Sequence, residues 1–394
     1  MNENWKKKRI EQCFKVKSGD FLPANKMAKE GSIDVYGGNG IAGKHDQHNL
    51  AGENIIIGRV GAKCGNVKRV SGNIWVTDNA FYISEFIEEF DLRFLEYLLS
   101  TKNLRDTANQ TAQPVISYKT IKNVILVIPP FSEQKRIVAI LDEAFEGIDR
   151  AIANTEKNLA NSRELFKSYL QSVFTERGEE WVKTTLGKVC QFENGDRGKN
   201  YPNREEYVES GIPWINTGHI QPDGTLSQSE MNFITREKYE SLRSGKIRPA
   251  DLVYCLRGAT IGKTALVAPF TVGAVASSLV IIRPSSLLDS HFLYYFLTSS
   301  VGQRLIKLYD NGAAQPNLGA KSVAKYTIFF PKLTKQQVIV QKLAALAAET
   351  QRLETIYRQK IAALNELKQS ILQKAFTGEL TADTAKTAKE EIAA

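Results

Sequence analysis

Residues 125–138 read ILVIPPFSEQKRIV, and 202 positions later residues 327–340 read TIFFPKLTKQQVIV. Each stretch begins as a short apolar strand, reaches Pro129 or Pro331, and continues into a long segment without proline. The hydroxyl residues Ser132 and Thr334 stand where a helix N-cap is expected, because their oxygens can accept hydrogen bonds from the first free backbone N–H groups. The pattern predicts the same strand-to-helix junction twice in one chain.

Both junctions open long predicted helices. Gly147 is the single glycine between 133 and 175, and none occurs between 335 and 376. A helix of about 42 residues spans roughly 63 Å. Apolar residues recur at heptad spacing along each helix, as is typical of a coiled-coil pair. The predicted seam consists of Leu141, Phe145, Ile148, Ile152, Leu159, Phe166, Leu343, Leu346, Leu353, Leu364, Leu367 and Ile371, with Lys360 as a defect.

This seam would be exposed to water on an isolated helix, so we expect the two helices to pack on each other within the chain. The alternative, in which each helix covers only its own domain, stays open.

Shorter motifs also recur, but at changing offsets. Trp181 to Gly195 repeats the Trp entry, apolar alternation and closing glycine of Trp5 to Gly19 at an offset of 176 residues. Three further pairs follow: Gly61 to Gly65 with Gly258 to Gly262, Phe94 to Leu99 with Phe292 to Leu297, and the Ala-Gln-Pro loops at 112–114 and 314–316. From these loops onward the offset stays at 202. Surface loops tolerate insertions, whereas a packed long helix does not tolerate a change of register.

The globular blocks contain short alternating runs separated by Gly, Asn and Pro, which predict strands with a few helices. Phe94 to Leu99 (FLEYLL) and Phe292 to Leu297 (FLYYFL) are each expected to begin a short helix. We therefore expect an α+β chain with two tandem mixed, β-rich domains, each followed by a long helix. The expected boundaries are 1–131 and 178–333 for the domains, 132–177 and 334–380 for the helical segments, and 381–394 for a flexible tail.

Positive charge is concentrated in the globular blocks. The chain has 394 residues and a formal net charge of +9. Residues 1–131 and residues 178–333 each carry 18 basic and 14 acidic side chains, which gives each block +4. This balance favours an anionic partner. The four cysteines form no CxxC pair, and the sequence has neither a signal peptide nor an apolar run long enough to span a membrane, so we expect a reduced cytoplasmic setting.

Three short motifs resemble enzyme signatures but lack a required feature. Residues 258–264 read GATIGKT, with three residues between the glycines where a phosphate-binding loop needs four. Residues 128–131 read IPPF, in which Ile128 cannot accept a hydrogen bond as the first residue of the NPPY-type tetrapeptide of amino-methyltransferases must. His45 and His48 form an HxxH pair without further ligands. We expect no catalytic residues, no metal and no cofactor bound by this chain.

Taken in order, these features resemble the specificity subunit of Type I restriction-modification systems over essentially the whole chain. The resemblance rests on Trp5 and Trp181, the two Ala-Gln-Pro loops, Pro129 and Pro331, the SEQKRIV segment at 132–138 and the QKAFTGEL segment at 373–380. The second helix opens with Thr334-Lys335-Gln336-Gln337 and so departs from the SEQ form, although it keeps Gln336.

The resemblance implies a specific architecture and role. It implies two target-recognition domains at the ends of an antiparallel helical pair with pseudo-twofold symmetry. Each domain would read one half of a split double-stranded DNA site, and the helices would fix the spacer and dock two methyltransferase subunits. Restriction forms add motor-nuclease subunits. S-adenosylmethionine would belong to the methyltransferase partner, and ATP and Mg to the motor-nuclease partner.

Polar and basic residues of the Gly-rich loops are the candidates for DNA contact, since Arg and Lys can read guanine and Asn can read adenine. The candidates are Asn39, Lys44, Arg59, Lys63, Asn216, Thr217, His219, Arg257 and Lys263. Two other functions stay open: a DNA-modifying enzyme with an unrecognised active site, and a coiled-coil scaffold without a role in DNA binding.

Overall fold

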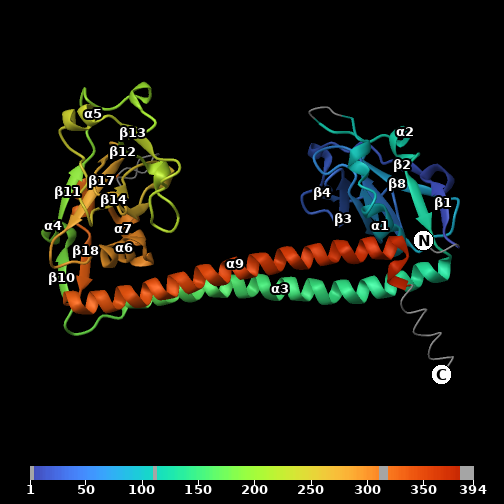
Figure 1. Ribbon diagram of the computed structural model, residues 1–394. Coiled ribbons are helices and arrows are strands. Elements are labelled where there is room, and N and C mark those ends of the chain that lie inside the picture. The colour runs from blue at the N-terminus through green and yellow to red at the C-terminus, as the bar shows by residue number, and fades with distance from the viewer. Residues whose placement is uncertain (1–3, 110–112, 310–317, 382–394) are drawn as a thin grey trace. The chain divides into compact units, whose positions relative to one another are not determined.

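The computed structural model describes residues 4–109, 113–309 and 318–381 (Figure 1). The chain divides into two compact units, and each is described by itself. The first unit consists of Met1–Glu156 with Arg358–Ala394, and the second of Lys157–Tyr357.

Two long helices are shared between the units. They are α3 (Phe131–Thr175) and α9 (Leu333–Thr377), each 45 residues long. The first half of α3 and the second half of α9 belong to the first unit, and the remaining halves belong to the second. Each helix is about 68 Å long at 1.5 Å per residue. The two predicted long helices are therefore confirmed.

The described part of the first unit contains three small sheets. The largest is antiparallel, with strand order β2-β8-β5-β6. In the second, β3 pairs with β4 antiparallel and with β7 parallel, and in the third β1 pairs with β9. The strands are β1 (Lys6–Arg9), β2 (Phe14–Ser18), β3 (Ile33–Gly37), β4 (Gly40–His45), β5 (Asn54–Gly58), β6 (Val67–Val70), β7 (Ile74–Val76), β8 (Ala80–Phe86) and β9 (Ile125–Ile128).

The second unit repeats this arrangement. Its four-stranded sheet has the order β11-β17-β14-β15, its three-stranded sheet the order β13-β12-β16, and β10 pairs with β18. The strands are β10 (Val182–Thr185), β11 (Cys190–Asn194), β12 (Ile212–Ile215), β13 (Asn232–Ile234), β14 (Leu252–Cys255), β15 (Thr264–Leu266), β16 (Ala274–Val275), β17 (Leu279–Pro284) and β18 (Thr327–Phe330). The prediction of a mixed helix-and-sheet domain present twice is confirmed.

Short helices complete both domains. The two predicted from the FLEYLL and FLYYFL motifs are present as α1 (Leu92–Ser100) and α6 (Ser290–Thr298), and the carboxylates of Asp91 and Asp289 cap them. The others are α2 (Tyr118–Ile121), α4 (Leu186–Val189), α5 (Arg236–Ser241), α7 (Ser300–Tyr309) and α8 (Ala320–Ala324).

A buried glutamine ties each domain to the start of its long helix. The side chain of Gln134 is 1% exposed; its Oε1 accepts from the amide of Asp91 (3.0 Å), and its Nε2 donates to the carbonyl of Pro129 (3.1 Å). Gln336 is fully buried and makes the same two contacts, with the amide of Asp289 (2.9 Å) and the carbonyl of Pro331 (2.8 Å). Strand end, short-helix cap and long helix are thereby joined at one side chain.

The predicted N-caps Ser132 and Thr334 are both wrong by two residues. The long helices begin at Phe131 and Leu333, so both hydroxyl residues lie inside the first turn. The carbonyl of Pro130 accepts from the amides of Glu133 and Gln134, which makes the proline the capping position. In the second helix the carbonyl of Lys332 accepts the corresponding hydrogen bonds, from the amides of Lys335 and Gln336.

In the first unit the beginning of α3 packs beside the end of α9. Leu141, Phe145 and Ile148 share one hydrophobic core with Leu372 and Ala375. The ammonium of Lys368 donates to both carboxylate oxygens of Asp149 (2.8 and 2.9 Å). The domain joins this contact, because Phe94 of α1 meets Phe376 of α9 edge to face at 5.5 Å.

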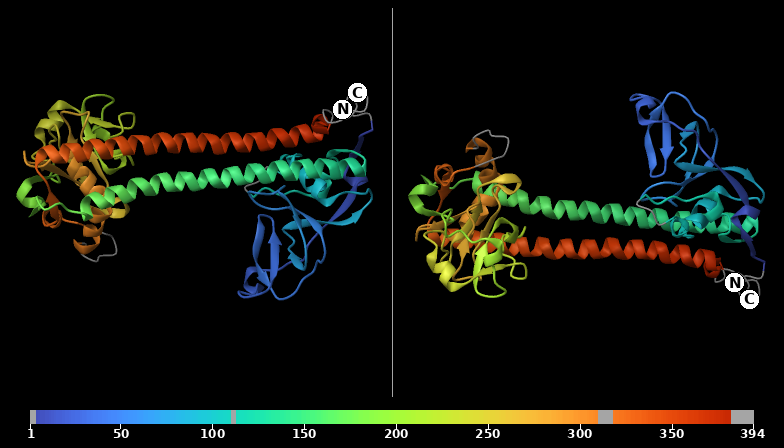
Figure 2. Two further views of the ribbon diagram at one scale, coloured as in Figure 1. Left: turned by 90° about the horizontal axis from the view of Figure 1, so that it is seen from below. Right: turned by 90° about the horizontal axis from the view of Figure 1, so that it is seen from above.

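The second unit has the matching arrangement, with the end of α3 beside the beginning of α9, and Figure 2 shows these two segments side by side. Leu170 and Phe174 share a core with Leu343. Arg163 binds Glu354 through two parallel hydrogen bonds (2.8 and 2.6 Å). Phe174 lies 5.2 Å from Phe292 of α6, which corresponds to Phe94 in the first domain. In each unit the helices therefore run antiparallel.

One predicted seam position is wrong. Leu367 is 48% exposed and Lys360 is exposed, whereas their neighbours Lys368 and Ile361 are half-buried. The contact face of α9 has thus moved by one residue beyond Tyr357. A straight helix has 3.6 residues per turn and drifts about 20° per heptad from a strict seven-residue repeat. Where the helix does not supercoil fully, the positions that face its partner therefore shift by one residue along the sequence. The other seam residues are buried or half-buried.

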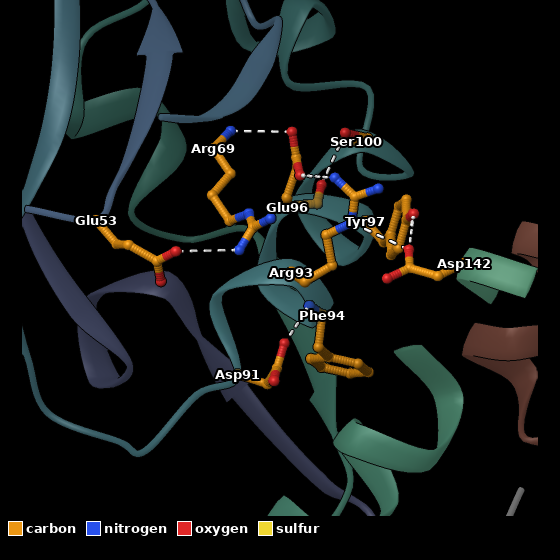
Figure 3. Close-up of polar contacts among 9 residues, drawn as sticks. All are labelled: Glu53, Arg69, Asp91, Arg93, Phe94, Glu96, Tyr97, Ser100 and Asp142. Carbon is orange, nitrogen blue, oxygen red and sulfur yellow. Dashed lines mark hydrogen bonds and ion pairs between the residues drawn. The ribbon is translucent and has the colours of Figure 1, made fainter. Parts of the chain in front are cut away.

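A chain of polar contacts joins the first domain to α3 (Figure 3). Asp142 of α3 accepts hydrogen bonds from the hydroxyl of Tyr97 (2.5 Å) and from Nε of Arg93 (3.1 Å). Arg93 also pairs with Glu96, whose other oxygen accepts from the amide of Arg69 on β6 (2.9 Å). In the second repeat, the position of Asp142 is Ala344. This polar attachment is therefore a property of the first domain.

Some predictions fall outside the described residues. These are the second Ala-Gln-Pro loop at 314–316, Ala112 of the first loop, and all but the first residue of the predicted tail. The described end of the first loop returns to the domain, since the carbonyl of Pro114 accepts from the amide of Gly61 at 3.0 Å.

We predict that Gln336→Ala loosens the attachment of the second domain. The change leaves the amide of Asp289 and the carbonyl of Pro331 without their side-chain partner, and a buried unpaired group such as that carbonyl costs about 1–3 kcal/mol. Hydrogen exchange at the Asp289 amide should accelerate at least tenfold. The matched control is Gln337→Ala, since Gln337 is exposed. Equal exchange in both variants would contradict the prediction.

Candidate nucleic-acid interface

The repeated glycine motif forms the same tight turn in both domains. In the first, the amide of Gly65 donates to the carbonyl of Gly58 (2.7 Å), and in the second, Gly262 donates to Cys255 (2.9 Å). The outer glycines of each motif have positive φ, between 74° and 100°. Glycine adopts this conformation without the steric cost that a Cβ would bring. The motif therefore has a backbone role, and it positions the polar residues on and beside it.

The first-domain turn brings two candidates together. Lys63 is exposed, and its amide donates to Oδ1 of Asn39 (3.2 Å), which is exposed as well. Both side chains are accessible on the same loop surface. Lys44 is exposed as well, so what distinguishes this pair is its hydrogen bond.

The other two first-domain candidates are engaged within the protein. The guanidinium of Arg59 donates to the carbonyl of Asp78 (3.1 Å) and lies over the ring of Phe81, and its Nε is buried without a partner among the described residues. Lys44 is paired with Asp34 (2.6 Å) on the β3–β4 hairpin. Arg59 in particular supports its loop.

Asn216, Thr217 and His219 form a 3₁₀ turn that begins directly after β12. Oδ1 of Asn216 accepts from the amide of Gly218 (2.9 Å), and Nδ1 of His219 accepts from the amide of Asn216 (3.1 Å). His219 is only 4% exposed, and burial lowers its pKa. The imidazole is therefore neutral at pH 7 and holds the turn instead of projecting from it. Asn216 and Thr217 are half-buried.

Arg257 and Lys263 are exposed on either side of the second-domain turn. Arg257 lines a pocket of about 640 Å³, together with two arginines that the sequence analysis missed, Arg197 and Arg243. The remaining lining residues are Asn194, Gly195, Asp196, Ser244, Leu256, Tyr309, Leu318, Gly319, Ala320 and Ser322. Three arginines and one carboxylate, that of Asp196, thus line the same recess.

Asp196 organises one side of this pocket. Its buried carboxylate accepts from the amides of Arg243 (2.9 Å) and Gly198 (2.8 Å), and it also faces the guanidinium of Arg243 (3.4 Å). These backbone hydrogen bonds, that of Arg243 first, hold the pKa of Asp196 below its usual range. The carboxylate therefore stays charged and fixes the loop that carries Arg243.

A second buried cluster supports the same loop from the sheet. Arg283 on β17 forms two hydrogen bonds with Asp251 (both 2.8 Å) and faces Glu193 of β11 (3.4 Å). Glu193 in turn accepts from the amides of Gly245 (2.7 Å) and Lys246 (3.1 Å). The segment after Arg243 is thus held against the sheet by paired charges.

Of the two missed arginines, Arg197 had a detectable signal in the sequence. Arg197 stands two residues beyond Gly195, where the repeated Trp-to-Gly segment ends. The loop after a repeated segment is where the two copies diverge, and Phe21 occupies the matching place in the first domain. Arg243 has no counterpart motif, and only the fold brings it to Arg257.

The described residues show neither a metal-binding cluster nor a helix that could span a membrane. No group of three or more His, Cys, Asp or Glu side chains is placed to hold a metal ion there. In the HxxH motif, His45 contacts the ring of Trp75 edge to face at 5.0 Å, and His48 is exposed. No helix in the described part of the chain is long and apolar enough to cross a membrane.

Comparisons with known proteins agree with the duplicated fold. The Escherichia coli Type I restriction enzyme EcoprrI specificity subunit is 30% identical over 39% of this chain and 38% of its own length. The E. coli EcoBI specificity subunit is 25% identical over 75% of this chain and 67% of its own length.

Among solved structures, a chain from a study of complex assembly and conformational transition of the type I R-M system matches 96% of this chain and 99% of its own, with a TM-score of 0.74 and 19% identity. That likeness shows the fold. Residues 2–160 and 178–363 also match the profile of the Type I restriction modification DNA specificity domain, once for each repeat. The chain belongs to the Type I restriction modification DNA specificity family.

Proposed function

We propose that this chain is a non-catalytic subunit that recognises a split site on double-stranded DNA, each domain reading one half. The proposal rests on one observation, which is that both domains are attached to the long helices in the same way. Each domain is tied by a buried glutamine to the start of one long helix and packs through a phenylalanine on the end of the other. Two DNA-binding domains attached in the same way to long, rigid helices suit two half-sites at a fixed spacing.

The long helices would form one antiparallel coiled coil with pseudo-twofold symmetry. The cross-helix pairs Asp149–Lys368 and Arg163–Glu354 support this, because the two residue numbers sum to 517 in both pairs. A constant sum means a single register along both helices. Such a frame acts as a ruler, since its length is set by residue count at about 1.5 Å per residue.

The same helices would dock two methyltransferase subunits and, in a restriction complex, motor-nuclease subunits. Leu165 and Ile356 are exposed apolar residues outside the seam, and partner subunits would cover such positions. S-adenosylmethionine, ATP and Mg would be bound by those partners. This chain would contribute recognition and assembly.

Footprinting on a randomised duplex library, with the methyltransferase partner added, tests the proposal. Two protected half-sites at a fixed spacing are expected. Turnover by the purified chain alone would instead indicate an enzyme, and the absence of any DNA preference would indicate a scaffold without a role in DNA binding.

We predict a steep salt dependence of DNA affinity. If each domain neutralises about four phosphates, log affinity falls with log salt at a slope of roughly −7, because bound cations are released from the duplex. Titration of the complex between about 50 and 200 mM salt measures the slope. A slope near zero would rule out the proposed phosphate contacts.

We also predict that the spacer follows the length of the helices. Deleting residues 148–154 together with their register partners 363–369 keeps the seam and shortens each helix by about 10 Å, or about three base pairs at 3.4 Å each. The preferred spacer should shorten while both half-sites stay the same, as read from selected duplexes. Deleting residues 148–154 alone is the control, and it should break the register and weaken assembly. If the paired deletion changed the half-sites themselves, it would contradict the proposal that the helices set only the spacer.

A further inference from the structure

The second-domain pocket contains three arginines with different surroundings. Arg243 faces the carboxylate of Asp196, and the guanidinium of Arg197 donates to the carbonyl of Ser277 (3.3 Å). The guanidinium of Arg257 has no ion pair or hydrogen bond to any described residue, and the side chain is exposed. One free cation therefore stands beside two tethered ones.

The backbone that carries Arg257 is held on both sides. The preceding residue, Leu256, is 1% exposed; its amide donates to the carbonyl of Ser278 (3.0 Å), and its carbonyl accepts from the amide of Leu318 (2.9 Å). The thiol of Cys255 donates to the carbonyl of Arg257 itself (3.3 Å). The backbone position of Arg257 is therefore fixed, while the N–H donors of its guanidinium stay free for a ligand.

We propose that Arg257 reads a guanine in the DNA half-site bound by the second domain, while Arg243 and Arg197 contact backbone phosphates beside it. The inference rests on the proposed DNA-reading function. The planar guanidinium offers two parallel donors that match the O6 and N7 acceptors of guanine in the major groove. A tethered arginine has fewer free donors but keeps its charge, which is sufficient for a phosphate contact that positions the duplex.

The first domain lacks this arrangement, which makes it an internal control. The alignment of Gly61 with Gly258 places Val60 at the position of Arg257. The alignment of Gly19 with Gly195 places Phe21, which is 74% exposed, at the position of Arg197. A guanine requirement due to this site should therefore appear in one half-site, at one base pair.

The experiment uses the full chain with its methyltransferase partner and a duplex library randomised in both half-sites. Three variants are compared with the unaltered chain: Arg257→Ala, Arg257→Lys and Arg243→Ala. In Arg257→Ala, discrimination for guanine at one position of the second half-site should fall about 10- to 100-fold. In Arg257→Lys it should fall less, because Lys can still donate to guanine but lacks the two parallel donors of the guanidinium. The first half-site should be unchanged. Arg257→Lys keeps the charge but lacks the fork, so its salt slope should stay at the unaltered value.

Arg243→Ala should weaken binding to all duplexes alike and reduce the salt slope by about one, with base preferences intact. The inference is overturned if Arg257→Ala behaves in this way, because Arg257 would then be a phosphate contact. It is also overturned if both Arg257 variants keep every base preference. A chain without any bipartite preference would refute the proposed function itself, which distinguishes that failure from a misassigned arginine.

Discussion

Two equivalent buried glutamines, one in each repeat, make the contact on which the attachment of the domains to the long helices depends. Gln134 and Gln336 each satisfy the amide of a helix-capping aspartate and the carbonyl of a strand-ending proline. Buried backbone groups must be paired, and here the long helix supplies the partner. In the second domain, which has no counterpart of Asp142, loss of Gln336 would leave mainly apolar contacts, which have little directional preference.

The two repeats use the same frame but differ in how much polar reinforcement they have. In the first domain, Asp142 of α3 binds Tyr97 and Arg93 of α1. Ala344 occupies the corresponding position on α9, so the second domain has no such carboxylate. Its polar clusters lie instead around Asp196 and Arg283, on the side of the arginine-lined pocket. Charge pairing thus stiffens the attachment in one domain and the candidate binding loop in the other.

Comparing the two halves of the sequence predicted the long helices and their junctions better than it predicted the residues of the candidate DNA-binding site. The strand-to-helix junctions, the helices from the FLEYLL and FLYYFL motifs, and most of the seam followed from periodicity and a constant offset. The prediction that Leu367 lies in the seam is wrong because a helix drifts from a strict heptad repeat. The prediction that Ser132 is the N-cap is wrong because the carbonyl of Pro130 already accepts the first hydrogen bonds of the helix. Among the candidates for DNA contact, His219 is buried and Arg59 is bound within its own domain.

The sequence by itself determined that this chain has two copies of one domain, two long helices and a positive charge of equal size in each globular block. These features are periodic or compositional, so they can be read without coordinates. Only the tertiary structure decided which side chains share a surface. Arg243 and Arg257 are 14 positions apart, with no motif between them to relate them. They line one pocket because buried ion pairs and backbone hydrogen bonds fold their loops against the same sheet.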